Sequence, residues 1–315
     1  IASAAALCTA ASTVLAQDYP SKPIKIVVPF TAGSATDIIA RAVGEGMRKE
    51  LGQPIIIENK PGAGGTLGAA QVASAPGDGY TLLVHSAGHV ANAYLYPTLR
   101  YDPVKDFKSL AMLASVPNVM VVSPQSGFKD VKAVVAKAKT EPGKLLYASA
   151  GNGSATHMNA EKFRVSTGID ATHVPYRGTP EAMTDVISGQ VQWFFAPITS
   201  ALPMIKDKKL VALAVGSPQR ATALPDTPTT VESGYPGSDY DFWIGLFAPA
   251  KLPPQIAERI QKATETALKS DAVKTRLVSL GANAPSIEPA KFEAFVRNDS
   301  AEVGKLISTA KITQN

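Results

Sequence analysis

Hydroxyl groups and bare backbone amides come together in the stretch PFTAGSATD, residues 29–37, which follows an apolar run and precedes a helical pattern. Ser34 and Asp37 fit the S-x-x-D form of a capping box, so a helix is expected to begin inside this stretch. The first N–H groups of a helix lack intrahelical partners, and with the helix dipole they attract an anion. Small residues let a carboxylate approach these amides, and the hydroxyls of Thr31, Ser34 and Thr36 can add donors. The alternative is plain capping, in which Ser34 and Asp37 only satisfy the helix itself.

The helix that must position this loop is visible as a buried stripe. Ile39, Val43, Met47 and Leu51 recur at helical spacing, and Gly52 ends the pattern. The sequence therefore predicts a helix that carries the loop at its N-terminus.

The same local plan recurs along the chain: an apolar run, a loop of small or hydroxyl-bearing residues, and then a helical pattern. Strands that alternate with helices predict βαβ units and parallel sheets, so the fold class is α/β. The loops that leave the carboxyl ends of such strands line the ligand crevice. The loops GAGG at 62–65 and SAGNGSATH at 149–157 combine glycines, which permit close backbone approach, with Ser154 or Thr156 at an expected helix start.

Motifs of other chemistries are incomplete. Gly62, Gly64 and Gly68 form G-x-G-x-x-x-G, one residue off the dinucleotide fingerprint, and the acidic Glu58 precedes the motif instead of following it. Neither a G-x-S-x-G elbow nor a P-loop sequence occurs in the chain. No cofactor is expected. No catalytic residue is assigned, because a nucleophile with an adjacent base cannot be assembled from the four histidines of the sequence.

The histidines do not predict a metal site either. His85 and His89 lie four residues apart but straddle the end of a predicted strand, so a metal pair is not expected. A capping or ligand-facing role for His89 or His157 is the alternative.

The first sixteen residues, IASAAALCTAASTVLA, are uncharged, small and apolar, as in an export signal. Val14 and Ala16 precede the expected cut, so we predict a signal peptide that is cleaved after Ala16 and a periplasmic protein. The run is too short for a spanning helix. Cleavage removes Cys8, the sole cysteine, which leaves no disulfide framework. Acylation of Cys8 is the alternative, disfavoured by the bulky Leu7 before it.

Composition bounds the remaining classes. With 315 residues, 45% hydrophobic and 18% charged, the chain is typical of a globular protein of two domains. The net charge of +5 is spread along the chain, with one cluster, KDKK, at 206–209. Scattered charge is typical of a solvated surface, and no nucleic-acid partner is expected.

Two apolar segments break the rhythm of the chain, at 112–124 and 241–249, and a helical tail follows the second. Each is long enough to cross from one domain to another. We predict a hinged pair of α/β domains with a ligand cleft between them. Domain 1 is expected to comprise residues 19–121 and 244–315, and domain 2 residues 122–243.

Several segments, taken together, resemble the solute-binding proteins of tripartite tricarboxylate transporters, the Bug or TctC-like proteins. They are YPSKPIKIVVPFTAGSATDIIAR, IIIENKPGAGGTLGA, APGDGYTLL, THVPYRGTPEAMTDVISGQV, LPDTPTTVESGYPG and FWIGLFAPAKLPPQIAERI. The resemblance runs from about residue 19 to the C-terminus. It implies a two-lobed type II periplasmic-binding-protein fold, of the Venus-flytrap kind, with a hinge of two crossover segments. It also implies a monomer without catalytic chemistry that passes a small carboxylate to membrane components of the transporter.

The resemblance also implies a set of ligand-binding positions in loops of both lobes. They are Phe30, Thr31, Ala32, Ser34, Ala35, Thr36, Asp37, Gly64, Ser86, His89, Ala150, Gly151, Ser154, His157, Arg177 and Pro197. The family commonly has Gly where this chain has Ser34, and often Lys where it has Arg177. Arg177 either clamps a distal carboxylate or is a surface charge. Asp37 is expected to cap its helix for a dicarboxylate ligand, or to pair with an ammonium group if the ligand carries one.

The ligand class remains open among dicarboxylates, tricarboxylates, aromatic acids and acidic amino acids. Two other functions use the same cleft. One is a sensor that presents its ligand to a membrane receptor kinase, and the other is a cleft hydrolase or transferase.

Overall fold

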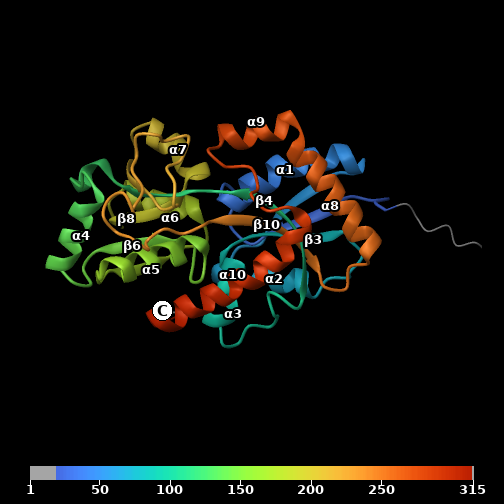
Figure 1. The fold of residues 1–315 in the computed structure, drawn as a ribbon, viewed down its shortest axis with the longest axis horizontal. Helices are drawn as coiled ribbons and strands as arrows, with labels where there is room; N and C mark the ends of the chain where they lie inside the picture. Colours follow the sequence, from blue (N-terminus) through green and yellow to red (C-terminus); the bar gives the residue numbers. More distant parts are fainter. Residues whose placement is uncertain (1–18, 314–315) are drawn as a thin grey trace, which may run out of the picture.

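The computed structural model describes residues 19–313, which form two lobes side by side (Figure 1). The predicted export signal, residues 1–16, lies outside the described residues. Each lobe is built on a five-stranded sheet covered by helices. The predicted α/β class and the two lobes joined by two crossover segments are confirmed.

Lobe 1 contains the sheet with the strand order β2-β1-β3-β10-β4. Strands β1, β2 and β3 are parallel, and β10 is antiparallel to both of its neighbours. The strands are β1 (Ile24–Val28), β2 (Ile55–Asn59), β3 (Thr81–Ser86), β4 (Phe107–Ser115) and β10 (Trp243–Pro249). The helices are α1 (Ala35–Leu51), η1 (Ala63–Gly65), α2 (Thr66–Ala73), α3 (Gly88–Leu95), α8 (Pro254–Lys269), α9 (Asp271–Ser279) and α10 (Pro289–Ala310).

Lobe 2 contains the sheet with the strand order β7-β6-β8-β5-β9. Strands β6, β7 and β8 are parallel, and β5 is antiparallel to β8 and β9. The strands are β5 (Asn118–Val122), β6 (Leu146–Ser149), β7 (Thr172–Pro175), β8 (Trp193–Pro197) and β9 (Val211–Val215). The helices are η2 (Pro124–Ser126), α4 (Val131–Thr140), α5 (Ala155–Thr167), α6 (Thr179–Ile187) and α7 (Ile198–Lys206).

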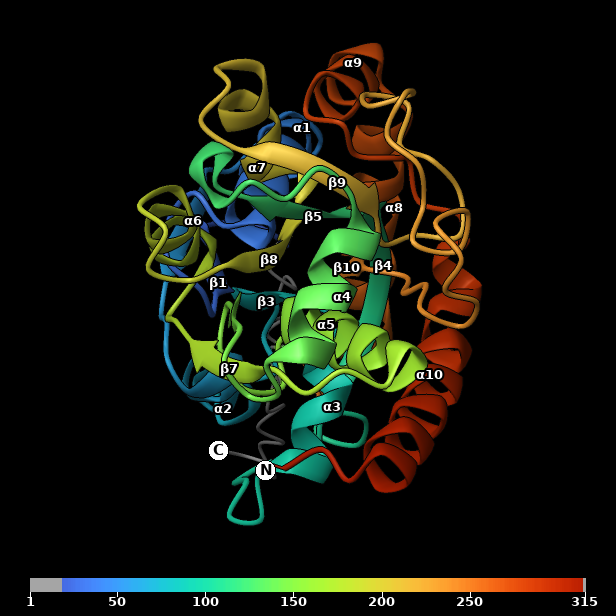
Figure 2. The same ribbon diagram turned by 90° about the vertical axis from the view of Figure 1, so that its left-hand side faces the viewer.

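The chain passes between the lobes twice. Residues 116–117 connect β4 to β5, and a longer segment at 216–242 connects β9 to β10. Helix α10 packs on β4 and α3 of lobe 1, runs along one edge of the molecule (Figure 2), and reaches α5 of lobe 2. Within residues 19–313, no helix is both long enough and apolar enough to cross a membrane.

The first helix follows its predicted stripe. Ile39, Val43, Met47 and Leu51 are buried against the sheet of lobe 1. Gly52 ends the helix in the left-handed region at φ 68°, where glycine has no steric penalty. The helix consequently starts where β1 ends, and its N-terminus faces lobe 2.

Six strand–loop–helix units follow the predicted plan: β1-α1, β2-α2, β3-α3, β6-α5, β7-α6 and β8-α7. In each, a helix N-terminus follows the carboxyl end of a parallel strand. Five of these loops or helix starts meet at one cavity between the lobes.

Candidate functional site

The interlobe cavity lies where helix starts of both lobes converge, and small, hydroxyl-bearing and phenyl side chains surround it. Its lining residues are Phe30, Ser34, Ala35, Thr36, Ser86, Ala150, Ser154, Ala155, Thr156, Thr179, Pro197 and Phe242. Among the described residues, this lining includes no Lys, Arg, Asp or Glu. The cavity measures about 20 Å³, room for little more than one water, so an organic ligand must part the lobes to enter.

The start of α1 forms the lobe 1 wall of this cavity. Ser34 is the N-cap residue, as predicted, but its side chain does not cap α1. The Ser34 hydroxyl instead accepts a hydrogen bond of 3.1 Å from the backbone N–H of Thr179 in lobe 2. Asp37 accepts from the backbone N–H of Gly33, at 3.0 Å, instead of from Ser34. The predicted capping box is therefore wrong in its bonds, because a contact from the other lobe takes the Ser34 hydroxyl.

Thr36 faces the cavity from the first turn of α1. Its side chain is 2% exposed, and within residues 19–313 its hydroxyl has no hydrogen-bond partner. A buried polar group without a partner is costly, and native structures usually satisfy it. The Thr36 hydroxyl and the uncapped start of α1 together form a set of donors that a bound anion can satisfy.

Asp37 is turned away from the interlobe cavity, into a cluster with Arg41 and Asn59. Arg41 Nη2 lies 2.8 Å from Asp37 Oδ1, and Asn59 Nδ2 donates to the same oxygen at 3.0 Å. Burial alone would raise the pKa of Asp37, but the hydrogen bonds from Arg41, Gly33 and Asn59 outweigh it and hold the pKa below its usual range. The carboxylate is thus ionised and already neutralised by Arg41.

The loop after β6 forms the lobe 2 wall, and its amides are satisfied within lobe 2. The Ala150 N–H donates to Thr156 Oγ1 at 2.9 Å. The Gly153 N–H donates to His157 Nδ1 at 3.1 Å, and the His157 N–H donates to Ser154 Oγ at 3.3 Å. Ser154 therefore caps α5, whereas Ser34 leaves α1 uncapped.

Two predicted ligand-facing histidines point into the lobes instead of the cavity. His89 is buried in lobe 1, where its Nε2 donates to the Pro103 carbonyl at 3.1 Å and its ring lies against Phe107 and Phe247. The His157 ring stacks on His173 at 4.0 Å in lobe 2. Neither ring therefore lies at the cavity in this structure, and ligand binding by either residue stays a prediction. Burial lowers the pKa of His89 and of His157 to about 3, so both are neutral.

Other predicted positions lie outside the lining of the interlobe cavity. Gly64, Gly151 and Arg177 line a separate outer opening of about 430 Å³, where the Arg177 side chain is exposed. Thr31 donates to Glu181 of lobe 2 at 3.0 Å, and Ala32 is exposed. The structure brings eight of the predicted positions together at the cavity itself: Phe30, Ser34, Ala35, Thr36, Ser86, Ala150, Ser154 and Pro197.

The predicted ligand-binding positions lack four lining residues, although Thr156 was expected at a helix start: Ala155, Thr156, Thr179 and Phe242. Ala155, Thr156 and Thr179 lie in the first turns of α5 and α6, and the helix starts in the sequence are the signal that could have added all three to the list. Phe242 lies on the second crossover, and nothing in its local pattern indicates a cavity.

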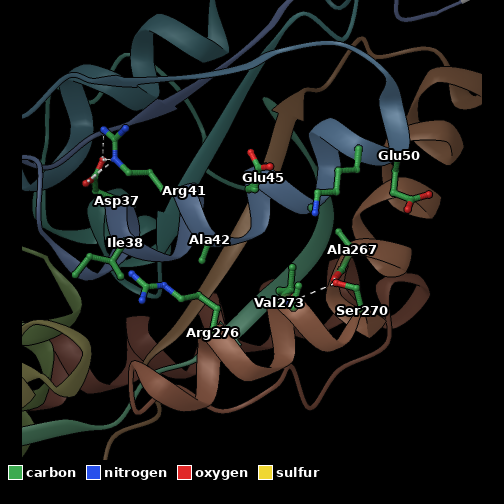
Figure 3. Close-up of a pocket in the computed structure, with 13 residues that line it drawn as sticks. Asp37, Ile38, Arg41, Ala42, Glu45, Glu50, Ala267, Ser270, Val273 and Arg276 are labelled. Atoms are coloured by element: carbon green, nitrogen blue, oxygen red, sulfur yellow. Dashed lines mark hydrogen bonds and ion pairs between the residues drawn. The ribbon is translucent and has the colours of Figure 1, made fainter.

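A more spacious pocket is a surface groove of lobe 1 of about 480 Å³, between α1 and the helices α8 and α9 (Figure 3). Its lining includes Arg41, Glu45 and Arg276, whose side chains are largely exposed, and Asp37 is paired with Arg41 at its edge. The groove belongs to one lobe and lacks the convergent helix starts of the interlobe cavity. Across the described part of the chain, no three His, Cys, Asp or Glu side chains are placed to hold a metal ion.

The chain matches the family described as Tripartite tricarboxylate transporter family receptor (TctC) over residues 39–312. The periplasmic binding protein BugD is 33% identical, with a TM-score of 0.89, over 94% of this chain and 100% of its own. MatC from Rhodopseudomonas palustris, solved with malate, is 35% identical, with a TM-score of 0.87, over 92% and 100%. An R. palustris protein solved with adipate is 31% identical, with a TM-score of 0.90, over 94% and 99%. This chain therefore belongs to the tripartite tricarboxylate transporter receptor family of two-lobed periplasmic binding proteins.

Proposed function

We propose that this protein captures a small organic carboxylate between its lobes and delivers it to the membrane components of a tripartite tricarboxylate transporter. Relatives with the same fold were solved with malate and with adipate. The observation that carries the proposal is the start of α1, whose amides are uncapped and whose Thr36 hydroxyl lies unsatisfied at the interlobe cavity among the described residues.

The ligand carboxylate binds at the first turn of α1. There the backbone amides and the Thr36 hydroxyl donate to it, and the helix dipole supplies positive potential. Phe30 and Phe242 contact the apolar body of the ligand, and Ser86 and Ser154 contribute hydroxyls from two other loops. Asp37 acts indirectly. Its pairing with Arg41 keeps its negative charge away from the ligand.

Binding without catalysis is the proposed role. A serine and a histidine do meet in lobe 2, Ser149 and His173, but the Ser149 side chain is 0% exposed and does not line the interlobe cavity. A buried hydroxyl cannot attack a ligand held at α1. A sensing role for a membrane receptor kinase uses the same site, and capture for transport is favoured by the family to which the chain belongs.

We further propose a periplasmic, monomeric protein whose first sixteen residues are removed on export. N-terminal sequencing of secreted material tests the cleavage after Ala16. The predicted domain division stays a proposal: residues 19–121 and 244–315 form domain 1, and residues 122–243 form domain 2. The position of β5 favours a first boundary at residues 116–117.

A panel of organic acids, sugars and nucleotides tests the ligand class by thermal shift. A ligand at one hundred times its Kd adds about 2.7 kcal/mol to the free energy of unfolding. We expect one or more organic acids to stabilise the protein and sugars and nucleotides to leave it unchanged. A sugar hit without an acid hit contradicts the proposal, and a ligand that is converted during incubation contradicts the role without catalysis.

Thr36→Val then tests the site. The variant removes a donor to a charged group and should weaken acid binding about ten- to a hundred-fold in titration calorimetry. It should not lower the melting temperature without ligand, because it removes a buried hydroxyl that has no partner within residues 19–313. Thr266→Val on the exposed face of α8 is the matched control, with unchanged affinity expected. If Thr36→Val binds the acid as tightly as the parent protein does, the ligand carboxylate does not bind at the Thr36 hydroxyl, and the proposed site is wrong.

A further inference from the structure

We propose that Ser34 determines ligand selectivity by occupying the start of α6 from across the cleft, which restricts the site to short ligands with a single carboxylate. This inference rests on the proposed function. It goes further by naming the ligand class and the residue that selects it.

The contact itself is close and well enclosed. Ser34 Oγ accepts from Thr179 N at 3.1 Å and lies 3.4 Å from Thr31 Oγ1, and the Ser34 side chain is buried. A Cβ placed on Gly178 would lie 2.7 Å from Ser34 Oγ, so the backbone at the start of α6 packs directly against this hydroxyl. Ser34 thus fills the place at α6 that a ligand oxygen would otherwise take.

The other helix starts of lobe 2 at the cavity are also engaged. Helix α5 is capped by its own Ser154, which accepts from the His157 N–H. At α7, the first amide, Ile198 N, donates to the Pro117 carbonyl at 2.9 Å. Ser34 holds the Thr179 N–H. In the closed protein without ligand, each of the helices α5, α6 and α7 therefore has one of its first backbone N–H groups already hydrogen-bonded. Lobe 2 is therefore poorly prepared for a second carboxylate, whereas α1 is uncapped.

Charge leads to the same conclusion. The described residues that line the interlobe cavity include no Lys or Arg. Next to the Ser34 contact, the Glu181 carboxylate accepts from Thr31 and would repel a second anion at the start of α6. Arg177 lines the outer opening together with Glu181, is exposed, and does not line the interlobe cavity.

Size adds a further restriction. A short ligand can sit at α1 while the Ser34 contact with Thr179 forms again as the lobes close. A longer ligand with two carboxylates must hold the start of α6 away from Ser34. It then loses this hydrogen bond and the neighbouring one from Ser200 Oγ to the Gly33 carbonyl, at 3.0 Å.

Titration calorimetry with acids matched in carbon number tests the inference. Butyrate is compared with succinate, and hexanoate with adipate. The parent protein should bind butyrate at least ten-fold more tightly than succinate, and adipate should bind more weakly than succinate. Ser34→Ala frees the Thr179 amide without adding bulk and should shift the affinity ratio toward succinate by about ten-fold.

Ser200→Ala is the matched control, because it also removes one hydrogen bond between the lobes but frees no helix amide. It should weaken both acids to a similar extent and leave their ratio unchanged. If the parent prefers succinate, or if Ser34→Ala and Ser200→Ala change the ratio equally, Ser34 is not the selecting residue although the receptor function stands. If none of these acids and no other acid of the panel binds, the proposed function fails as well.

Discussion

Ser149 Oγ and His173 Nε2 lie 2.6 Å apart, directly beneath the loop of lobe 2 that faces lobe 1. Ser149 Oγ also accepts from the Gly151 N–H at 3.0 Å, and the His173 ring stacks on His157, which accepts from the Gly153 N–H. Buried side chains of lobe 2 therefore hold the backbone of this loop from below. The outer side of the loop contacts lobe 1.

The first prediction concerns Ser149→Ala, which leaves the Gly151 N–H without its acceptor. Losing a buried hydrogen bond in this way should lower the free energy of unfolding by about 1–3 kcal/mol. Ligand affinity should fall as well, because the loop carries Ala150 and Ser154 of the cavity. Urea unfolding and titration calorimetry measure the two effects. Ser188→Ala on the exposed end of α6 is the control, and equal behaviour of the two variants would show that Ser149 does not support the loop.

A second prediction concerns closure of the lobes at Gly178. A Cβ at this position would lie 1.9 Å from Thr31 Oγ1 and 2.7 Å from Ser34 Oγ, both in lobe 1. Gly178→Ala should therefore hold the lobes apart and weaken ligand binding at least ten-fold. The melting temperature without ligand should change little, since φ −176° is open to alanine.

Gly44→Ala provides the comparison for Gly178→Ala, because it adds the same methyl group inside lobe 1, near Ile55, and not between the lobes. Alanine is also the better residue in a helix interior, by up to about 1 kcal/mol. We expect normal affinity for this variant. Small-angle X-ray scattering with saturating ligand should show compaction for Gly44→Ala and none for Gly178→Ala. Compaction of both would mean that the contact at Gly178 does not control closure.

Much of the fold could be predicted from local pattern. The apolar stripe of α1 and the alternation of apolar runs with helical segments depend on neighbours in sequence, and the structure has both. The antiparallel placement of β5 and β10 was not predicted. Their side chains show only that they are buried strands, whereas the order within a sheet depends on contacts far along the chain.

The site was predicted less completely, for a related reason. A loop sequence shows which residues have hydroxyl or imidazole groups, but not which way they point. Ser34 has the residue type of an N-cap, yet its partner is Thr179, 145 residues away in the other lobe. His89 and His157 follow loops that reach the cavity, but their rings fill the lobe interiors. Packing between segments far apart in the sequence decides these orientations, so the spacing of residues within one loop cannot predict them.

A third prediction concerns acid stability, because the described part of the chain buries all of its histidines. Burial lowers the pKa of His89, His157 and His173 to about 3, and it also holds the pKa of His85 well below its usual value. The unfolded chain binds protons at these side chains below about pH 6.5, and the folded chain does not. Their stabilising effect is thus complete above pH 6.5 and is lost as the pH falls.

Each histidine should contribute a slope of about 1.4 kcal/mol per pH unit below about pH 6. Guanidinium unfolding at pH 7.5, 6.5 and 5.5 measures the total slope. His89→Phe places a phenyl ring beside Phe107 and Phe247 and removes one titrating group. It should reduce the slope by the contribution of one proton, about 1.4 kcal/mol per pH unit, whatever its effect on stability at pH 7.5. A slope that is unaffected by His89→Phe would indicate that this imidazole is protonated in the folded protein.

The last prediction concerns Asp299 on α10, for which the dependence of stability on pH has the opposite sign to that of the histidines. Asp299 accepts a hydrogen bond of 3.0 Å from Trp243 Nε1. Burial raises the pKa of Asp299 to about 6; the Trp243 bond opposes the rise, and Asp241 and Glu302 add to it. Because the folded pKa lies above the unfolded value of about 4, its stabilising effect is complete below pH 4. It is lost as the pH rises through 6.

Asp299→Asn keeps an acceptor for Trp243 and removes the partly buried charge. It should raise the free energy of unfolding by about 2 kcal/mol at pH 8 but by only about 0.4 kcal/mol at pH 4, because the parent carboxyl is then protonated in the folded protein and about half protonated in the unfolded chain. Glu293→Gln, an exposed position on the same helix, should show little effect at either pH, since its ion pair with Arg297 is on the surface. Guanidinium unfolding of the three proteins at pH 4, 6 and 8 gives the comparison. An equal gain for Asp299→Asn at pH 4 and pH 8 would mean that the carboxylate is not titrating in the folded protein, and the gain would then have to come from packing of the amide.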